Sequence, residues 1–210
     1  CIRDSLVTIL EIRKEEALKI IKITHPCEKP LYNNKISCEN VETMLGYELD
    51  EFQKGCLNVI QESQKDLLAM APTGSGKTAV ALISVLQAFK NENDAVYTSP
   101  IKALSNQKYG EFKNWFEDHN IDAGVTLLTG DIRIKADTEK KRKLIICTSE
   151  ILRNKLTGMD NDEDLKNIGC LISDEVHYIN DAERGNVWEE TIFNLPKSVQ
   201  FVLSLIHISE

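Results

Sequence analysis

The chain has 210 residues, which is enough for one well-buried domain and a short additional segment. Its content of 42% hydrophobic and 28% charged residues is ordinary for a globular protein and excludes a chain that is disordered throughout. A formal charge of −8 argues against a general basic surface for nucleic acid, so any such contact must be local.

The cysteines and the apolar stretches bear on location. Six cysteines are scattered without a C-x-x-C pair, and Cys147 and Cys170 lie inside apolar runs, so we interpret them as reduced thiols. No apolar stretch approaches the roughly 20 residues of a membrane span, and the N-terminus lacks the layout of a secretory signal. We expect an intracellular protein without a membrane partner, in either the cytoplasm or the nucleus.

Residues 1–45 form the first region, an N-terminal extension and linker. Two prolines and several polar residues in THPCEKPLYNN interrupt an apolar pattern that precedes them. We predict a helix or a hairpin followed by a linker. Because the first residue is Cys rather than Met, we also expect a fragment or a processed product. The apolar residues near helical spacing are Leu6, Val7, Leu10, Ala17, Leu18 and Ile21.

From residue 46 to residue 210, short apolar strands alternate with amphipathic helices. This alternation predicts a mostly parallel sheet with helices on both faces, which is a three-layer α/β sandwich. Ligands of such folds bind at the carboxyl ends of the strands. We expect strands at 66–71, 95–99, 124–130, 143–149 and 170–175, and helices at 76–90, through 107–118 and after Glu150.

The stretch LLAMAPTGSGKTAVALISVL places a strand, a glycine-containing turn and a helix in immediate succession. The turn has the layout of a phosphate-binding loop, although position 71 is Ala where the strict pattern has Gly. Gly74 and Gly76 let backbone N–H groups surround phosphate oxygens, and the helix N-terminus adds its dipole. Lys77 would reach the outer phosphates, and Thr78 would ligate Mg²⁺.

Two adjacent carboxylates, Asp174 and Glu175, follow the apolar strand at 170–173. Like charges at the end of a buried strand repel each other unless a cation is present. A phosphate-binding loop binds a nucleoside triphosphate with Mg²⁺, and a second strand must deliver an acidic residue to that ion. We therefore expect Asp174 to serve the metal and Glu175 to orient or deprotonate the attacking water.

Six segments together resemble the first motor lobe of the DExH-box helicases of superfamily two. The similarity spans residues 46–203, and within the superfamily SPIKALSNQKY and DEVHYINDAERGNVWEE are similar to the superkiller-type RNA helicases that feed the RNA exosome. The resemblance implies a P-loop NTPase fold of the RecA-like type, with ATP and Mg²⁺ as cofactors. The segments are FQKG from Phe52, APTGSGKT from Ala71, TSPIKALSNQKY from Thr98, TGD from Thr129, TSEIL from Thr148 and DEVH from Asp174.

The resemblance also assigns roles at the nucleotide. Gln53 would read the adenine edge, because an amide both donates and accepts hydrogen bonds, and Tyr47 would stack on the base. His177 would link the nucleotide state to the movement of the helicase. The phosphates would be held by Thr73, Gly74, Ser75, Gly76, Lys77 and Thr78.

The family places single-stranded RNA across the loops at the strand ends. Such loops grip the sugar-phosphate backbone without reading bases, which suits an enzyme that moves along any sequence. The basic run at 140–143 is interpreted instead as a solvated turn. The implied RNA contacts are Pro100, Lys102, Ala103, Gly130, Asp131, Thr148 and Glu150.

The end of the chain departs from the family pattern. After LPKSVQFVL the family continues with Ser-Ala-Thr, whereas this chain reads SLIHISE, so we expect a truncated lobe with a non-native tail. ATP in these motors is hydrolysed between two RecA-like lobes, and the second supplies arginine fingers. We expect the isolated chain to bind ATP and Mg²⁺ weakly and to hydrolyse ATP poorly.

The parent protein is expected to be an ATP-dependent RNA helicase for RNA processing or decay, with the exosome or its adaptors as partners. Two alternatives stay open. One is a DNA helicase or translocase of the same superfamily, because sugar identity is read by few groups. The other, for this fragment, is a non-catalytic nucleotide-binding module; a small-molecule P-loop kinase would not need the loops at the strand ends.

Overall fold

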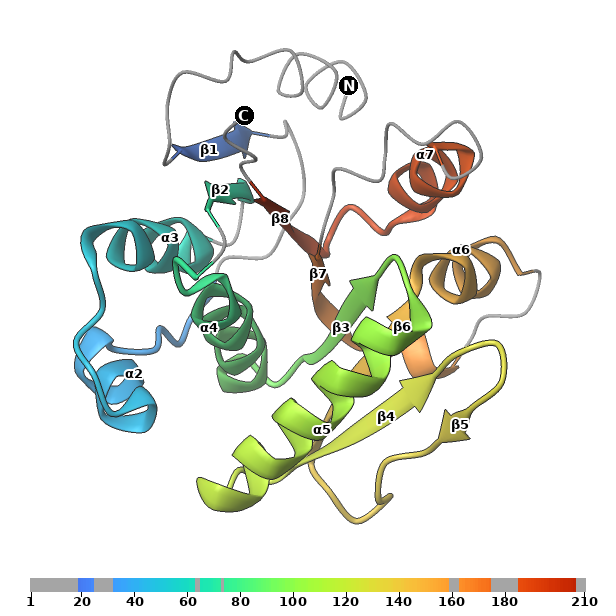
Figure 1. Ribbon diagram of the computed structural model, residues 1–210, viewed down its shortest axis with the longest axis horizontal. Helices are drawn as coiled ribbons and strands as arrows, with labels where there is room; N and C mark the ends of the chain where they lie inside the picture. Colours follow the sequence, from blue (N-terminus) through green and yellow to red (C-terminus); the bar gives the residue numbers. More distant parts are fainter. Residues whose placement is uncertain are drawn as a thin grey trace.

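A mostly parallel sheet forms the middle layer of the computed structural model, which describes residues 19–24, 32–62, 65–72, 74–158, 163–174 and 185–206 (Figure 1). Within these ranges the sheet has eight strands, of which the six inner ones are parallel and the two at the edges antiparallel. The strands are β1 (Lys19–Thr24), β2 (Lys65–Ala71), β3 (Asp94–Ser99), β4 (Ala123–Leu128), β5 (Arg133–Ile134), β6 (Arg142–Thr148), β7 (Ile168–Ser173) and β8 (Gln200–Ile206).

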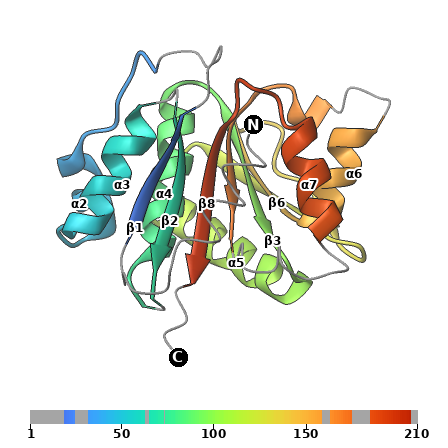
Figure 2. The same cartoon turned by 90° about the horizontal axis from the view of Figure 1, so that it is seen from above.

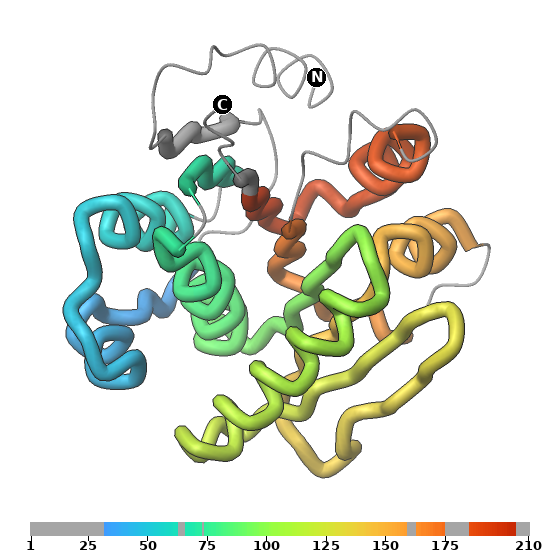
Figure 3. The backbone as a smooth tube through the Cα atoms, in the orientation of Figure 1, coloured from blue at the N-terminus to red at the C-terminus, as the bar shows by residue number. Residues whose placement is uncertain are grey.

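The strand order is β1-β2-β8-β7-β3-β6-β4-β5. The chain runs outward from β2 through β3 to β4 and β5, and it returns through β6 and β7 to β8, filling the positions it had passed over (Figure 3). This path places β2 and β7, which are far apart in sequence, on either side of a single strand, β8.

Helices cover both faces of the sheet (Figure 2). Crossovers between parallel strands are right-handed, so helices on the outward path and helices on the return path must lie on opposite faces. The outward helices α4 and α5 accordingly share one face with α2 and α3, and α6 and α7 cover the other (Figure 2). The helices are α2 (Cys38–Leu45), α3 (Glu51–Gln61), α4 (Lys77–Lys90), α5 (Lys102–Asp118), α6 (Ser149–Thr157) and α7 (Gly185–Asn194), with a 3₁₀ turn η1 (Glu163–Leu165) before β7.

The α4 face holds the larger core. The sequence of α4 is apolar almost all round, and every residue from Ala79 to Ala88 is buried. In α5 the apolar residues Phe112 and Phe116 point inward, and the Phe116 ring meets Phe89 edge to face at 5.8 Å. Each large apolar side chain buried in this way stabilises the fold by about 1.5–3 kcal/mol. The first turns of α4 and α5 are therefore held firmly at the carboxyl edge of the sheet.

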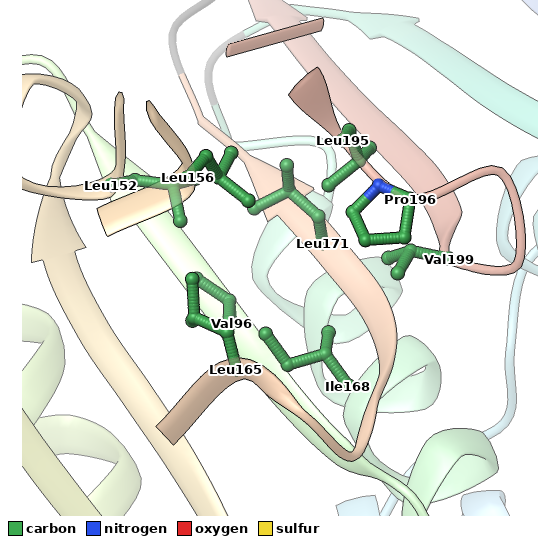
Figure 4. A pocket seen from close by; sticks show the side chains of 9 residues that line it. All are labelled: Val96, Leu152, Leu156, Leu165, Ile168, Leu171, Leu195, Pro196 and Val199. Atoms are coloured by element: carbon green, nitrogen blue, oxygen red, sulfur yellow. The ribbon is translucent and has the colours of Figure 1, made fainter. Parts of the chain in front are cut away.

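The α6–α7 face holds a smaller core with a packing defect. Trp188 is 2% exposed and belongs to the same buried cluster as Leu203 of β8. Between α6, β7 and the turn after α7 lies an apolar cavity of about 20 Å³ (Figure 4). Its lining consists of Val96, Leu152, Leu156, Leu165, Ile168, Leu171, Leu195, Pro196 and Val199.

Two parts of the N-terminal extension, 19–24 and 32–45, are described, and they bear on the expectation of a helix or a hairpin followed by a linker. Residues 19–24 form β1, which pairs antiparallel with β2 from Lys19–Met70 to Thr24–Lys65, so the helical alternative is wrong there. An open edge of a sheet offers unpaired backbone groups that outweigh local helical spacing. Residues 38–45, expected as linker, form α2, whose Val41 is fully buried. The rest of the extension, 1–18 and 25–31, lies outside the described residues.

The predicted three-layer α/β fold is confirmed over residues 65–206. Each expected strand and helix in this range is present, with boundaries shifted by a few residues. Among the described residues, no helix combines the length and the apolar composition that crossing a membrane requires.

Candidate functional site

The loop between β2 and α4 has the backbone of a phosphate-binding turn. Gly74 and Gly76 have φ values of 85° and 77°, which only glycine adopts without strain. Gly76 is also the N-cap of α4, and it provides no side-chain acceptor for the first N–H groups of the helix. These donors and the helix dipole suit a phosphate group. Thr73 lies outside the described residues.

Side chains of the loop fold back onto its own carbonyl groups. The Lys77 ammonium donates to the carbonyl oxygen of Ala71 at 2.9 Å and to that of Pro72 at 3.2 Å. The Ser75 hydroxyl donates to the same Pro72 oxygen at 2.7 Å. Lys77 is therefore held over the turn, and Thr78, the second residue of α4, is exposed.

Gln53 in α3 reaches this loop. Its Oε1 accepts the backbone N–H of Asp50 at 3.1 Å, which directs the amide nitrogen away from the helix start. A Cβ on Gly76 would lie 2.1 Å from that nitrogen, so the amide touches the first turn of α4. Gln53 is 4% exposed, whereas Tyr47, in the turn between α2 and α3, is 47% exposed. Gln53 thus lies at the phosphate loop. Tyr47, six residues earlier in the sequence, has an exposed ring.

Asp174 is positioned by β3. Its backbone N–H donates to the Thr98 carbonyl at 2.9 Å, which continues the pairing of β7 with β3 beyond Ser173. The Tyr97 hydroxyl donates to Oδ2 of Asp174, and Tyr97 is itself 2% exposed. The carboxylate is consequently held at the sheet edge by a buried phenol. Glu175 and His177 lie outside the described residues.

The phosphate loop and Asp174 lie on the same edge of the sheet. Parallel pairing of β8 with both β2 and β7 puts Ala71 and Ser173 at the same end. With neighbouring strands about 4.8 Å apart, the axes of β2 and β7 are separated by about 10 Å. A loop with helix N–H donors and Lys77, facing Asp174 at this spacing, fits a magnesium-nucleotide complex, because the carboxylate can reach the ion directly or through its water shell.

A second group of predicted residues gathers at the loops after β3 and β4. Lys102 at the start of α5 forms an ion pair with Asp131 at 2.5 Å, and both side chains are exposed. A Cβ on Gly130 would lie 3.3 Å from the Lys102 ammonium. The structure therefore brings three of the predicted RNA contacts together.

The starts of α5 and α6 are neighbours at the same edge. Ser99 pairs with Thr148 across β3 and β6, so the chain leaves both strands at the same edge of the sheet. Pro100 is buried directly after β3, and Ala103 is exposed in the first turn of α5. The N-caps of both helices, Ile101 and Thr148, make no side-chain capping bond. Glu150 sits half-buried in the first turn of α6. Backbone N–H donors are thus available to an anion at both helix starts.

The basic run at 140–143 lies elsewhere. It precedes and opens β6, at the amino end of the strand and hence at the opposite edge of the sheet. Lys140 and Lys141 lie 4.0 and 3.9 Å from the carboxylate of Asp122. The interpretation as a solvated turn is confirmed for Lys140 and Lys141, which are exposed, and is wrong for Arg142 and Lys143, which are half-buried in β6.

Two residues with contacts at the site were missed from the sequence. Tyr97 binds Asp174, and the only sequence signal was a hydroxyl-bearing aromatic near the end of an apolar strand. Lys108 in α5 donates to the Thr78 hydroxyl at 3.3 Å, and nothing in the local pattern indicated that contact. Both contacts depend on which elements become neighbours.

Comparison with known proteins identifies relatives. A profile of the DEAD/DEAH box helicase family matches residues 50–205. Antiviral helicase SKI2 of Saccharomyces cerevisiae is 40% identical over 191 residues, covering 90% of this chain and 14% of that protein. Superkiller complex protein 2 of Mus musculus is 44% identical over 158 residues, covering 75% of this chain and 12% of that protein. The mtr4 ATP-dependent RNA helicase of Schizosaccharomyces pombe is 42% identical over 156 residues, 74% of this chain and 13% of its own length.

This chain therefore spans only 12–14% of the length of these relatives. Among solved structures, the DUF1998 helicase MrfA bound to DNA and AMPPNP gives a TM-score of 0.64 at 19% identity, covering 99% of this chain and 31% of that chain. Such a similarity concerns the fold alone. The family match contains both the phosphate loop and Asp174, and together with the superkiller-type relatives it shows that the chain belongs to the DEAD/DEAH box helicases.

Proposed function

We propose that this chain is the ATP-binding lobe of an ATP-dependent RNA helicase that couples ATP hydrolysis to RNA unwinding or translocation. The observation that carries this proposal is the shared edge of the sheet. The phosphate loop after β2 and Asp174 after β7 have one strand between them, and the loops after β3, β4 and β6 continue along the same edge. A helicase can couple hydrolysis to RNA movement if ATP and RNA bind to loops of the same rigid sheet.

The nucleotide site uses the chain as follows. Bound Mg²⁺-ATP would supply the phosphoryl group for hydrolysis and the metal charge that stabilises its transfer. Backbone N–H groups from Thr73 to Gly76 would cradle phosphate oxygens, Lys77 would contact the outer phosphates, and Thr78 and Asp174 would hold the metal. The hydrogen bond from Tyr97 keeps the Asp174 carboxylate in place.

The remaining nucleotide contacts are proposed from the family pattern. Gln53, which lies against Gly76, would hydrogen-bond the base. Tyr47 stacks on the base with its exposed ring. Glu175 orients or deprotonates the attacking water, and His177 passes the nucleotide state to the moving parts of the helicase.

Single-stranded RNA is the proposed track. The uncapped starts of α5 and α6 and the Lys102 ammonium offer donors to phosphates, without a base-reading surface. Local contacts of this kind reconcile nucleic-acid binding with a net charge of −8. The proposed contacts are Pro100, Lys102, Ala103, Gly130, Asp131, Thr148 and Glu150.

The proposed partners of the whole protein are taken from its relatives. Superkiller complex protein 2 is named for a complex, and we propose the RNA exosome or its adaptors, together with a second RecA-like lobe, as partners of the whole protein. An intracellular location is proposed because the described cysteines form no disulfide and Cys56, Cys147 and Cys170 are buried.

Binding of a fluorescent ATP analogue with Mg²⁺, and of a short single-stranded RNA of mixed sequence, tests the proposal. Lys77→Ala should weaken nucleotide binding by about tenfold or more, because it removes a charge-assisted contact worth about 1.5–3 kcal/mol. Lys113→Ala, an exposed lysine on α5, is the matched control and should change nothing. Absence of nucleotide binding by the wild type, or an unaffected Lys77→Ala variant, would contradict the proposal.

A DNA helicase or translocase is the second candidate, because the MrfA structure of the same fold was solved with DNA. Competition between RNA and DNA oligonucleotides of one sequence separates the two. Preference for RNA supports the first candidate, and equal or stronger DNA binding supports the second.

A further inference from the structure

Lys108 connects the two functional regions of the domain. It lies in α5, six residues after Lys102, which corresponds to about 9 Å along the helix. Its side chain is 13% exposed, although lysine side chains normally extend into water. The ammonium lies 3.3 Å from the Thr78 hydroxyl oxygen, in the first turn of α4. A largely covered cation at the surface therefore touches the residue proposed to ligate the metal.

Lys108 also contacts a carboxylate on its own helix, and that carboxylate has a further hydrogen-bond donor. Its ammonium pairs with Oε2 of Glu111 at 2.7 Å, and the amide of Gln107 donates to Oε1 of Glu111 at 2.6 Å. Burial raises the pKa of Glu111, but the hydrogen bonds from Lys108 and Gln107 outweigh this effect and lower it. The carboxylate is thus charged at neutral pH, and it gives the ammonium a charged acceptor besides the Thr78 hydroxyl.

The contact with Thr78 conflicts with metal binding. A threonine hydroxyl offers its oxygen lone pairs either to an N–H donor or to a metal ion. Two cations that share one neutral oxygen repel each other, and the repulsion is strengthened where water is partly excluded. Glu111 offers Lys108 another acceptor, so the lysine can leave Thr78 without losing its charge partner.

From this geometry we propose that Lys108 competes with Mg²⁺ for the Thr78 hydroxyl, so that α5 is bonded to the start of α4 only when the metal is absent. The proposal rests on the proposed function, since it takes Thr78 as a metal ligand. Lys108 acts as a positioning residue. The contact between α4, which follows the phosphate loop, and α5, which carries Lys102, would then depend on whether the metal is bound.

The test measures the dissociation constant of a fluorescent ATP analogue with Mg²⁺ and again in EDTA. The ratio of the two constants reports how much Mg²⁺ strengthens binding. A general defect in folding would weaken binding equally with and without Mg²⁺, so it would not change the ratio. Lys108→Met should increase the gain from Mg²⁺ by about two- to fivefold, the size expected for a partly screened ionic interaction. Glu111→Gln should change the ratio in the opposite direction, because it leaves Lys108 without its counter-charge.

Two further variants sharpen the result. Lys113→Met removes an exposed lysine from the same helix and should leave the ratio unchanged. Lys108→Arg keeps the cation and should stay closer to wild type than Lys108→Met does.

An unchanged or smaller gain from Mg²⁺ in Lys108→Met overturns this inference while the proposed nucleotide site stands. If the wild type binds no nucleotide with Mg²⁺, the inference and the proposed function both fall. If Glu111→Gln and Lys108→Met shift the ratio in the same direction, the competition is excluded.

Discussion

At the scale of single residues, Gly76 meets two requirements at once. Its φ of 77° belongs to the left-handed region, and its missing Cβ makes room for the amide of Gln53. Any other residue would meet both backbone strain and a side-chain clash at the start of α4. The phosphate loop therefore depends on this glycine for its shape and for its contact with α3.

Gly76→Ala should abolish nucleotide binding and lower the free energy of unfolding by about 1–3 kcal/mol, since left-handed backbone alone costs about 1–2 kcal/mol. Gly110→Ala in α5 is the control, because no heavy atom lies within 4 Å of its Cβ position. That change should be neutral or stabilise by up to about 1 kcal/mol, as alanine favours helix. Nucleotide titration and urea unfolding measure both variants. Normal nucleotide binding by Gly76→Ala would contradict the role of Gly76 in shaping the phosphate loop.

The ion pair between Lys102 and Asp131 sets the charge available to RNA. Asp131→Asn should tighten binding of single-stranded RNA by about two- to fivefold at low salt, because it releases Lys102 from a competing carboxylate. The gain should shrink as salt rises. Asp122→Asn, near lysines at the opposite edge, is the matched control. Weaker binding by Asp131→Asn would mean that the carboxylate itself supports the RNA contact.

At the scale of elements, α5 is the part that spans both regions. Its first residue, Lys102, meets Asp131, and Lys108 meets Thr78 on another side of the helix. Ser105 bonds to Ser99 of β3 at 2.7 Å, while Phe112 is buried, so the helix is attached to the sheet along its length. A helix fastened in this way behaves as one body.

The cavity between α6 and β7 makes the second face sensitive to loss of volume. Leu152 is 1% exposed and lines the cavity, so Leu152→Ala enlarges an existing void. We expect a loss of about 3 kcal/mol in the free energy of unfolding, within the range for buried leucine truncations. Ile134→Ala, on the exposed β5, should cost less than about 0.5 kcal/mol. Equal effects of the two changes in chemical denaturation would contradict this.

Acid should weaken the link that η1 makes to α6 and β6. Burial raises the pKa of Asp164, but hydrogen bonds and charges from Lys155 and Lys143 outweigh it and lower that pKa below its ordinary value. A lowered folded pKa stabilises the fold above the unfolded pKa, and this contribution is lost as pH falls through the folded pKa. Melting temperatures should therefore fall less in Asp164→Asn than in wild type on acidification below about pH 4. A larger fall of the melting temperature in Asp164→Asn than in wild type would contradict this prediction.

At the scale of the whole molecule, antiparallel strands close both edges of the described sheet. β1 covers β2 and the short β5 covers part of β4, so the parallel strands that carry the site are all internal. Gln87 of α4 accepts the Ile36 N–H at 3.0 Å, which joins the segment before α2 to the central helix. The described parts of the extension thus pack on the lobe, and a domain boundary near residue 46 stays a prediction.

A polypeptide of these 210 residues should bind Mg²⁺-ATP weakly and turn it over slowly, with or without RNA. Arginine fingers from a second lobe are worth about 10³–10⁵ in rate in related phosphoryl-transfer enzymes. Phosphate release assays on this polypeptide and on a complete two-lobe relative provide the comparison. RNA-stimulated turnover equal to that of the complete relative would refute the prediction.

The local sequence pattern was enough to predict the fold class and the position of the phosphate loop. Alternating apolar strands and helices indicated the three-layer fold, because the periodicity of burial follows the geometry of each element. The turn from Gly74 to Thr78 indicated a phosphate loop, because backbone N–H groups can surround a phosphate only where glycine permits the turn. Asp174 was predicted to serve a metal because it and Glu175 are adjacent carboxylates after a buried strand in a chain with a phosphate loop, and that role stays a prediction.

The neighbours of these segments were decided by tertiary structure alone. The path of the chain put β8 between β2 and β7, and it brought Tyr97 to Asp174 and Lys108 to Thr78. It also made a strand of residues 19–24 against β2. Contacts between distant residues depend on strand order and crossover hand, which no local period encodes.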